Sequence, residues 1–341
     1  MTAKVRVLIV DDSAFMRTAI KRVLERDGRF EIVGEAKDGQ DAVASAARLR
    51  PQVISMDFNM PVMNGAEATR AILGLDRIPI VILSAHAKEG AAETMEALAA
   101  GAVDFVMKPS GEVSADLSRV AEELTEKLIS ASGAHPQRFE VVRPPPGPRV
   151  MRSIPPPAGL HLVVIAVSTG GPAALRSVIP ALPGDVRFAV VVVQHMPAQF
   201  TAALAARLHE ESEVTVREAV VGDRPLPAQV LVAPGDRHLV FGDYGAVRLT
   251  DAEPVNGCRP SADVTLASAA ELFGRRLTAV VMTGMGRDGA EGMAKVRAAG
   301  GRTFAQDART SVVFGMPKAA IDRGVVDEVL PLEEIAARLL R

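Results

Sequence analysis

The chain has 341 residues, of which 48% are hydrophobic, and its formal net charge at pH 7 is −2. That is enough apolar material for two domains. A nearly neutral chain without a sustained basic run lacks the electrostatic footprint of nucleic-acid binding, so no nucleic acid is expected as a partner. The apolar runs are far shorter than the roughly 20 residues of a membrane helix, and the N-terminus enters a strand without a signal segment. We therefore expect a cytoplasmic protein with no direct membrane insertion.

A single cysteine, Cys258, stands in the sequence. One thiol can form neither an internal disulfide nor a multi-cysteine metal site. We interpret Cys258 as a small packed side chain rather than a reactive thiol.

Short β-rich runs alternate with helical patterns in the first part of the chain. VRVLIV (5–10), VISMD (53–57) and IPIVILSA (78–85) are such runs, and AFMRTAIKRVLERD (14–27) has helical periodicity. Alternation of this kind predicts an α/β fold in which helices cover both faces of a doubly wound parallel sheet. Residues 1–125 are predicted to form this first domain.

A proline-rich segment follows. Residues 126–158 contain the end of a helix and then two proline triplets among small residues, which interrupt any helical or strand period. Such a segment acts as an extended, semi-rigid spacer. We predict that it links two domains.

The same alternation recurs in residues 159–341, where apolar runs such as LHLVVIAV (160–167) and FAVVVVQH (188–195) precede helical patterns. This predicts a second α/β domain with a parallel sheet. The stretch from about 214 to 250 is broken by Gly, Pro and Asp and is interpreted as short strands and hairpins.

Carboxylates follow two strands of the first predicted sheet. Asp11 and Asp12 come directly after residues 5–10, and Asp57 ends residues 53–57. The carboxyl ends of parallel strands meet at one edge of the sheet, where an oxygen-only cluster suits Mg²⁺. Lys108 and Ser84 also end strands and can contact a phosphoryl group on Asp57. The alternative is an acidic loop surface with Ser84 as a turn residue.

The set Asp11, Asp12, Asp57, Ser84 and Lys108, with MPVMNG after Asp57 and KP at the end, resembles the receiver domain of bacterial response regulators over about residues 4 to 125. The resemblance implies that a histidine kinase phosphorylates Asp57. It also implies that Mg²⁺ binds through Asp11, Asp12, Asp57 and a backbone carbonyl near Asn59. Signalling is then expected through Ser84 and Phe105, and because Phe105 has no hydroxyl, any switch there acts by packing.

The stretch VVIAVSTGGPAAL (163–175) runs from an apolar strand through a Gly-rich turn into a helix. Such a turn can cradle a phosphate, cap the helix, or present Ser168 as a nucleophile. The first alternative is weakened because no Lys follows the glycines. His195 and Asp288 also follow strands of this second sheet, so they share its carboxyl edge with Ser168. Together the three residue types suit acyl transfer by a serine nucleophile, a histidine base and an orienting carboxylate.

Several long motifs, VSTGGP, QHMPAQFTAALAARL, LVAPGDRHL, NGCRPSADVTLASAA, MTGMGRDGAEGM and AQDARTSVVFGMPKAAIDRG, resemble the protein-glutamate methylesterase domain of the bacterial CheB family. The match spans nearly all of 160 to 341. It implies that Ser168 is the nucleophile, His195 the base and Asp288 its orienting group, with Thr169 supporting the site. Backbone amides near Met285 are the expected oxyanion hole, where neighbouring glycines allow close approach.

The resemblance implies hydrolysis of glutamate methyl esters, releasing methanol, and deamidation of glutamines on the cytoplasmic helices of chemoreceptors. It implies Mg²⁺ for receiver phosphorylation and no cofactor for the esterase step. It also implies that the unphosphorylated receiver restrains the esterase. Two alternatives remain: an esterase of the same family in a non-chemotactic sensory pathway, and a non-catalytic, phosphorylation-dependent binding protein.

Overall fold

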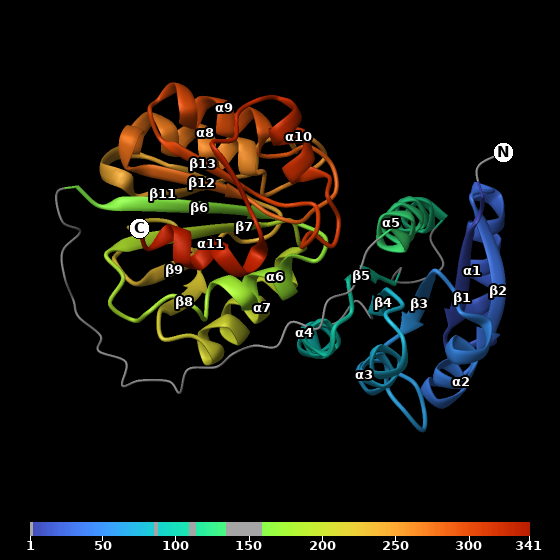
Figure 1. Cartoon of the computed structure of the whole chain (residues 1–341). Helices are drawn as coiled ribbons and strands as arrows, with labels where there is room; N and C mark the ends of the chain where they lie inside the picture. The colour runs from blue at the N-terminus through green and yellow to red at the C-terminus, as the bar shows by residue number, and fades with distance from the viewer. Residues whose placement is uncertain (1–2, 85–87, 109–113, 134–158) are drawn as a thin grey trace. The chain divides into compact units, whose positions relative to one another are not determined.

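The computed structural model describes residues 3–84, 88–108, 114–133 and 159–341. The chain divides into two compact units, residues 1–138 and 139–341, each built around its own parallel sheet (Figure 1). The predicted α/β fold class is therefore confirmed. The proline triplets of the predicted linker lie outside the described residues.

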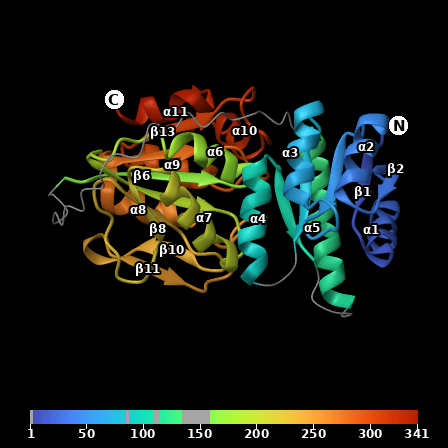
Figure 2. The same cartoon turned by 90° about the horizontal axis from the view of Figure 1, so that it is seen from below.

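The first unit is a five-stranded parallel sheet with the strand order β2-β1-β3-β4-β5. Helices α1 and α5 pack together on one face, while α2, α3 and α4 cover the other (Figures 1 and 2). Ligands bind such sheets at the carboxyl edge where the strand order reverses, which here lies between β1 and β3. The strands are β1 (Val5–Val10), β2 (Phe30–Ala36), β3 (Val53–Asp57), β4 (Ile80–Ser84) and β5 (Asp104–Met107). The helices are α1 (Ala14–Asp27), α2 (Gly39–Leu49), α3 (Gly65–Leu75), α4 (Lys88–Ala100) and α5 (Ser114–Ser132).

Local sequence signals account for the helix ends near the first carboxyl edge. Ser13 caps α1 by accepting a hydrogen bond from the backbone amide of Met16. Asn64 and Glu67 form a reciprocal capping box at the start of α3. Gly65, the first residue of α3, lies so close to the carbonyl of Asp57 that a Cβ would stand 2.6 Å from its oxygen. The glycine therefore lets α3 begin directly against the end of β3.

The second unit is a seven-stranded parallel sheet with the order β14-β13-β12-β6-β7-β9-β8. Helices α8, α9 and α10 lie on one face, and α6, α7 and α11 lie on the other (Figure 1). The strands of this sheet are β6 (His161–Val167), β7 (Phe188–Gln194), β8 (Thr215–Glu218), β9 (Gln229–Val232), β12 (Leu277–Val281), β13 (Arg302–Gln306) and β14 (Glu328–Leu330). The helices are α6 (Gly171–Val178), α7 (Ala198–Glu211), α8 (Ala262–Phe273), α9 (Ala290–Ala298), α10 (Met316–Asp322) and α11 (Leu332–Leu339), with 3₁₀ turns η1 (Asp243–Gly245) and η2 (Gly274–Arg276).

The region from 214 to 250 differs in part from the sequence prediction. A hairpin does form between β10 (His238–Phe241) and β11 (Val247–Thr250). However, β8 and β9 are parallel strands of the main sheet rather than a hairpin. Because parallel neighbours need a connection that returns along the sheet, residues 219–228 cross back between them. Short strands flanked by Gly and Pro look alike in either arrangement, so the sequence pattern does not separate the two.

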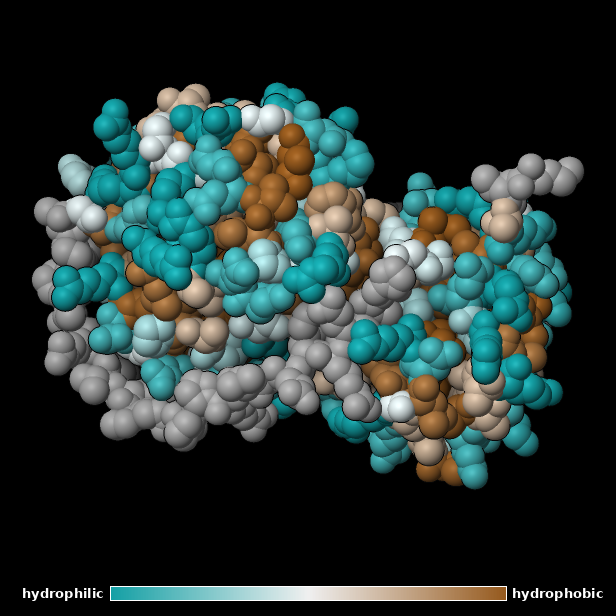
Figure 3. All heavy atoms as spheres, viewed as in Figure 1, coloured by the Kyte–Doolittle hydropathy of each residue, from teal (hydrophilic) through white to brown (hydrophobic). Residues whose placement is uncertain are grey.

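The central strands are buried on both faces. All of β7 and β12, for example, is buried, which fits their uninterrupted apolar sequences. On the visible face of each unit, hydrophilic side chains surround smaller hydrophobic areas (Figure 3). None of the described helices combines the length and the apolar character that a membrane span requires.

Candidate active site

Three neighbouring strands bring the predicted catalytic residues to one edge of the second sheet. Ser168 follows β6 and His195 follows β7, while Asp288 lies in the loop between β12 and α9. In the sheet, β6 stands between β12 and β7. The strand order reverses between β6 and β12, so the cluster occupies the position where open α/β sheets bind ligands.

The backbone holds Ser168 in a tight turn before α6. Its amide donates to the carbonyl of Thr283 at 3.0 Å, and its own carbonyl accepts from the amide of Gly171 at 2.7 Å. Gly170 adopts φ 76° at the start of the helix, a conformation that favours glycine. The Gly-rich sequence thus places a half-buried serine at the amino end of α6.

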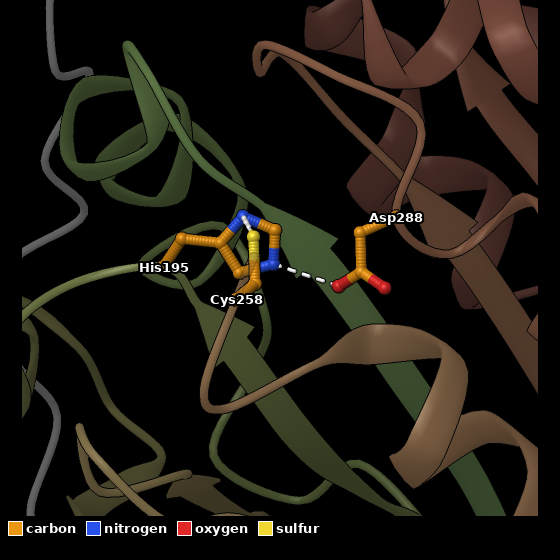
Figure 4. Close-up of side chains that lie close together, drawn as sticks. All are labelled: His195, Cys258 and Asp288. Atoms are coloured by element: carbon orange, nitrogen blue, oxygen red, sulfur yellow. Dashed lines mark hydrogen bonds and ion pairs between the residues drawn. The ribbon is translucent and has the colours of Figure 1, made fainter. Parts of the chain in front are cut away.

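His195 and Asp288 form a direct pair. Nε2 of His195 lies 2.8 Å from Oδ2 of Asp288, and a dashed line marks this contact in Figure 4. Because a carboxylate accepts, Nε2 carries the proton and Nδ1 is left as the basic nitrogen. Burial alone lowers the pKa of His195, but the hydrogen bonds to Asp288 and Cys258 outweigh it and raise the pKa to about 9. Burial raises the pKa of Asp288, yet its bond to His195 dominates and lowers the pKa to about 2.

The segment before α8 holds the carboxylate of Asp288 in place. The hydroxyl of Ser261 donates to Oδ1 at 2.6 Å, and the amide of Ala262 donates to Oδ2 at 2.6 Å. The side chain of Asn256 adds a bond to Oδ1 at 3.2 Å. Asp288 is 1% exposed, so these bonds replace the water that the carboxylate loses. This support, supplied by residues of the NGCRPSAD motif, was not predicted from the sequence.

Cys258 contacts the other nitrogen of the base. Its Sγ lies 3.5 Å from Nδ1 of His195 (Figure 4), and the residue is half-buried. The interpretation of Cys258 as a packed side chain was therefore incomplete. Within the described part of the chain, the hydroxyl of Ser168 makes no hydrogen bond to His195. In apo structures such catalytic bonds are often long and tighten only with substrate.

A buried glutamine ties the turns of the serine and the histidine together. Nε2 of Gln194, at the end of β7, donates to the carbonyl of Ser168 at 3.0 Å and to that of His195 at 3.1 Å. The Gln194 residue is 2% exposed. A Cβ added to Gly171 would stand only 2.0 Å from Oε1 of Gln194. Glycine at position 171 therefore makes room for this clamp, which the sequence analysis did not identify.

The predicted oxyanion loop lies beside Ser168. A Cβ added to Gly284 would stand 2.7 Å from Cβ of Ser168, so the two backbones are in close contact. The amide of Gly284 donates to the carbonyl of Val313 and is already occupied. Met285 is 38% exposed and lies on the solvent side of this loop. Thr169 is buried, and its carbonyl accepts a bond from the Thr283 hydroxyl at 2.9 Å, which anchors the turn.

The acidic cluster of the first unit forms around a lysine. Nζ of Lys108 lies 2.8 Å from Oδ2 of Asp11 and 2.9 Å from Oδ2 of Asp57. Burial lowers the pKa of Lys108, but its contacts with the two carboxylates outweigh this and raise it. Burial raises the pKa of Asp57 to about 6 despite the lysine. Among the residues that the structure describes, this edge thus sets the buried carboxylates of Asp11 and Asp57 against the ammonium of Lys108.

Carboxylate oxygens from Asp11, Asp12 and Asp57 lie within 4.8 Å of one another. Hard oxygen donors at this spacing fit Mg²⁺. The side-chain amide of Asn59 donates to Glu93 at 3.0 Å, which leaves the backbone of Asn59 as its group for a metal.

The predicted switch residues lie near this edge. Ser84 is 1% exposed, and its Oγ accepts a hydrogen bond from the Thr94 hydroxyl at 2.6 Å. Phe105 is buried, and Nζ of Lys127 stands 5.2 Å from the centre of its ring. The Ser84–Thr94 bond links the end of β4 to α4, a connection that the sequence did not reveal.

Two family models match the chain. Residues 7–116 match the response regulator receiver domain, and residues 163–339 match the CheB methylesterase. The protein-glutamate methylesterase/protein-glutamine glutaminase of Symbiobacterium thermophilum is 44% identical over 352 residues, covering 99% of this chain and 96% of the relative. The protein of the same name from Thermotoga maritima is 44% identical over 339 residues, covering 98% of each chain.

A solved structure resembles the second unit. The crystal structure of the Thermotoga maritima CheB methylesterase catalytic domain aligns with a TM-score of 0.52 and 46% identity, covering 53% of this chain and 97% of that one. Relatives therefore match both parts of the chain and its full length. The chain belongs to the CheB family of protein-glutamate methylesterases/protein-glutamine glutaminases, with a response-regulator receiver domain before the esterase domain.

Proposed function

We propose that this chain hydrolyses glutamate methyl esters and deamidates glutamines on chemoreceptor cytoplasmic helices, and that phosphorylation of its receiver activates it. The observation that carries the proposal is the buttressed His195–Asp288 pair beside the Ser168 turn. It supports catalysis over a binding role because five hydrogen bonds converge on one buried carboxylate. A protein that only bound its partner would not need that arrangement.

In the proposed reaction, the Ser168 oxygen attacks the carbonyl carbon of the substrate while Nδ1 of His195 accepts the serine proton. Asp288 holds Nε2–H and stabilises the imidazolium that forms. Amides near Met285 hold the oxyanion of the tetrahedral intermediate. The imidazolium then returns its proton to the leaving group, which departs as methanol from an ester or ammonia from an amide. Water attacks the acyl-serine by the same route and releases the glutamate and the free serine.

In the receiver, Asp57 accepts a phosphoryl group from the histidine kinase of the pathway. Asp11, Asp12, Asp57 and a backbone carbonyl near Asn59 would hold Mg²⁺, which would supply positive charge to offset that of the transferred phosphoryl group. Lys108, already in contact with Asp57, is placed to pair with the added charge. Ser84 then responds to phosphorylation through its hydrogen bonding, and Phe105 responds through its packing.

Methanol release from methylated receptor membranes tests the esterase. The wild-type chain is expected to release methanol, and more so with acetyl phosphate and Mg²⁺. Ser168→Ala removes nearly all release, because no other group supplies the nucleophile. Ser177→Ala, a matched change in α6, serves as the control and retains activity. Turnover by Ser168→Ala close to that of the control refutes the assignment of the nucleophile.

Labelling with acetyl phosphate tests the receiver. Phosphoryl incorporation is expected in the wild type with Mg²⁺ and is lost in Asp57→Ala. Asp76→Ala, at the exposed end of α3, is the control and is labelled normally. Removing Mg²⁺ with a chelator abolishes labelling, since the carboxylates then repel the donor. Persistent labelling of Asp57→Ala shows that another residue is phosphorylated.

A further inference from the structure

Cys258 and the base of the esterase turn two possible metal-ligand atoms toward each other. One ligand atom from each of His195, Cys258 and Asp288 lies within 4.8 Å of the other two (Figure 4). Sγ of Cys258 and Nδ1 of His195 are 3.5 Å apart. Zinc bonds of about 2.3 Å to sulfur and about 2.0 Å to nitrogen, at a tetrahedral angle, separate these two atoms by about 3.5 Å. An ion can therefore join them with little movement of either side chain.

Asp288 does not need to leave its partners for such an ion to bind. Its two oxygens are already engaged by Ser261, Ala262, Asn256, Asp263 and His195. It holds Nε2–H of the imidazole at 2.8 Å, so once the ring is neutral its Nδ1 lone pair faces the sulfur of Cys258. A carboxylate that holds the far nitrogen of a ligating histidine is the usual support of zinc sites. The catalytic orienting group thus also prepares His195 as a ligand.

We propose that Zn²⁺ binds between Nδ1 of His195 and the sulfur of Cys258 and reversibly inhibits the esterase. The thiol and the protonated imidazole each release a proton on binding, and water completes the tetrahedral shell around the ion. Thiolate and imidazole select a soft cation such as Zn²⁺ over Mg²⁺, which prefers the carboxylates of the receiver. The side chain of His195 is 12% exposed and Cys258 is partly buried, so neither ligand residue is completely sealed from solvent.

The inhibitory effect follows from the position of the ion. Zinc on Nδ1 occupies the lone pair that must accept the proton of Ser168, so neither attack nor leaving-group protonation can proceed. Inhibition therefore rests on the proposed function, whereas binding of the ion does not. The two are measured separately.

Cobalt(II) serves as a spectroscopic substitute that tests the site alone. The full-length, metal-stripped protein is titrated with Co²⁺ in the presence of excess Mg²⁺, which occupies the receiver carboxylates. A thiolate-to-cobalt charge-transfer band is expected in the near ultraviolet, because Cys258 is the single cysteine in the chain. Added Zn²⁺ removes the band by displacement. Absence of the band in the folded wild type overturns the proposal without any variant being needed.

Zinc titration of methanol release tests the consequence. Each protein is compared with its own zinc-free rate, and inhibition of the wild type is reversed by a chelator. Cys258→Ser, which keeps the shape of the side chain, is expected to raise the half-inhibitory concentration at least roughly tenfold. His161→Gln, which removes a histidine at the opposite edge of the same sheet, leaves it unchanged. Equal zinc sensitivity in Cys258→Ser and wild type overturns the site.

A methanol assay in which the wild type shows no zinc-free activity refutes the proposed function instead. The cobalt band then still decides whether the metal site exists.

Discussion

At the scale of single residues, His195 is held between the carboxylate of Asp288 and the sulfur of Cys258, and both favour its charged form by accepting from the imidazolium. Burial lowers the pKa of His195, but the bonds to Asp288 and Cys258 outweigh it and raise the pKa to about 9. A base must be neutral to accept a proton. Near neutral pH the resting imidazole is therefore largely protonated, and the fraction of active enzyme grows as the pH rises.

This predicts that kcat/KM for methanol release increases with pH and levels off above about 9. The profile is measured in a chelating buffer, and spontaneous ester hydrolysis is subtracted with Ser168→Ala. Asp288→Asn removes the charge that raises the pKa, so the midpoint moves down while the plateau falls by up to about 10⁴. A profile that is flat between about pH 6 and pH 9 in the wild type contradicts the assignment of His195 as the base.

At the scale of elements, the loop from β12 to α9 and the turn from β6 to α6 pack backbone against backbone. Gly284 makes this contact possible, because a Cβ there would meet Cβ of Ser168 at 2.7 Å and Sδ of Met316 at 2.4 Å. The methionine can move, but the serine turn is held by hydrogen bonds to Thr283 and Gly171. The position of the nucleophile thus depends on a glycine in another element.

Gly284→Ala is accordingly expected to lower kcat by about 10²-fold, the cost of displacing a reacting group by about 1 Å. KM should change much less, since the substitution moves the nucleophile rather than the binding surface. Gly222→Ala is the control: it introduces strain at φ +89° but has no atom within 4 Å of the new Cβ. If both variants lose stability and only Gly284→Ala loses activity, the loss is positional. Unchanged kcat in a folded Gly284→Ala protein contradicts the argument.

At the scale of the whole molecule, a receiver and an esterase share one chain, and residues 1–138 and 139–341 are separate compact units. Each unit has its own sheet and its own polar cluster at a carboxyl edge. The esterase unit aligns with a relative whose catalytic domain was crystallised alone. The esterase unit is therefore expected to fold without the receiver.

A shortened chain that starts at Gly159 is expected to be more active on methylated receptors than the unphosphorylated full-length protein. A coupling of about 1–3 kcal/mol between the units corresponds to a change of about 5- to 150-fold. Acetyl phosphate should not change the rate of methanol release by the shortened chain, because that chain lacks Asp57. Initial rates of methanol release from both proteins, with and without acetyl phosphate, measure the effect. Basal activity that is equal or lower in the shortened chain rules out simple inhibition and leaves the receiver as an activator or a localisation module.

Much of the fold follows from local sequence patterns. Apolar runs alternate with helical periods, and parallel strands share a carboxyl edge, so the residues that end strands gather there. Ser168 and His195 are therefore predicted at one edge, and Asp11 and Asp57 at another. The hairpin at β10 and β11 was also predicted, but the parallel pairing of β8 and β9 was not, because period-2 patterns carry no strand direction.

The atomic contacts of the active site depend on segments that are distant in sequence, and only the tertiary structure decided them. It places β12 next to β6, which brings Asp288 to His195 across 93 residues of sequence. It also determines that Nε2 of His195 faces the carboxylate and that Cys258 contacts Nδ1. In addition, it determines that Gln194 donates to the carbonyls of Ser168 and His195. Side-chain rotamers and long-range hydrogen bonds settle only when the chain packs, since local periodicity records which face a residue occupies and not which atom it meets. The sequence by itself determined the fold class and the edge at which each cluster lies, and packing decided which atoms meet there.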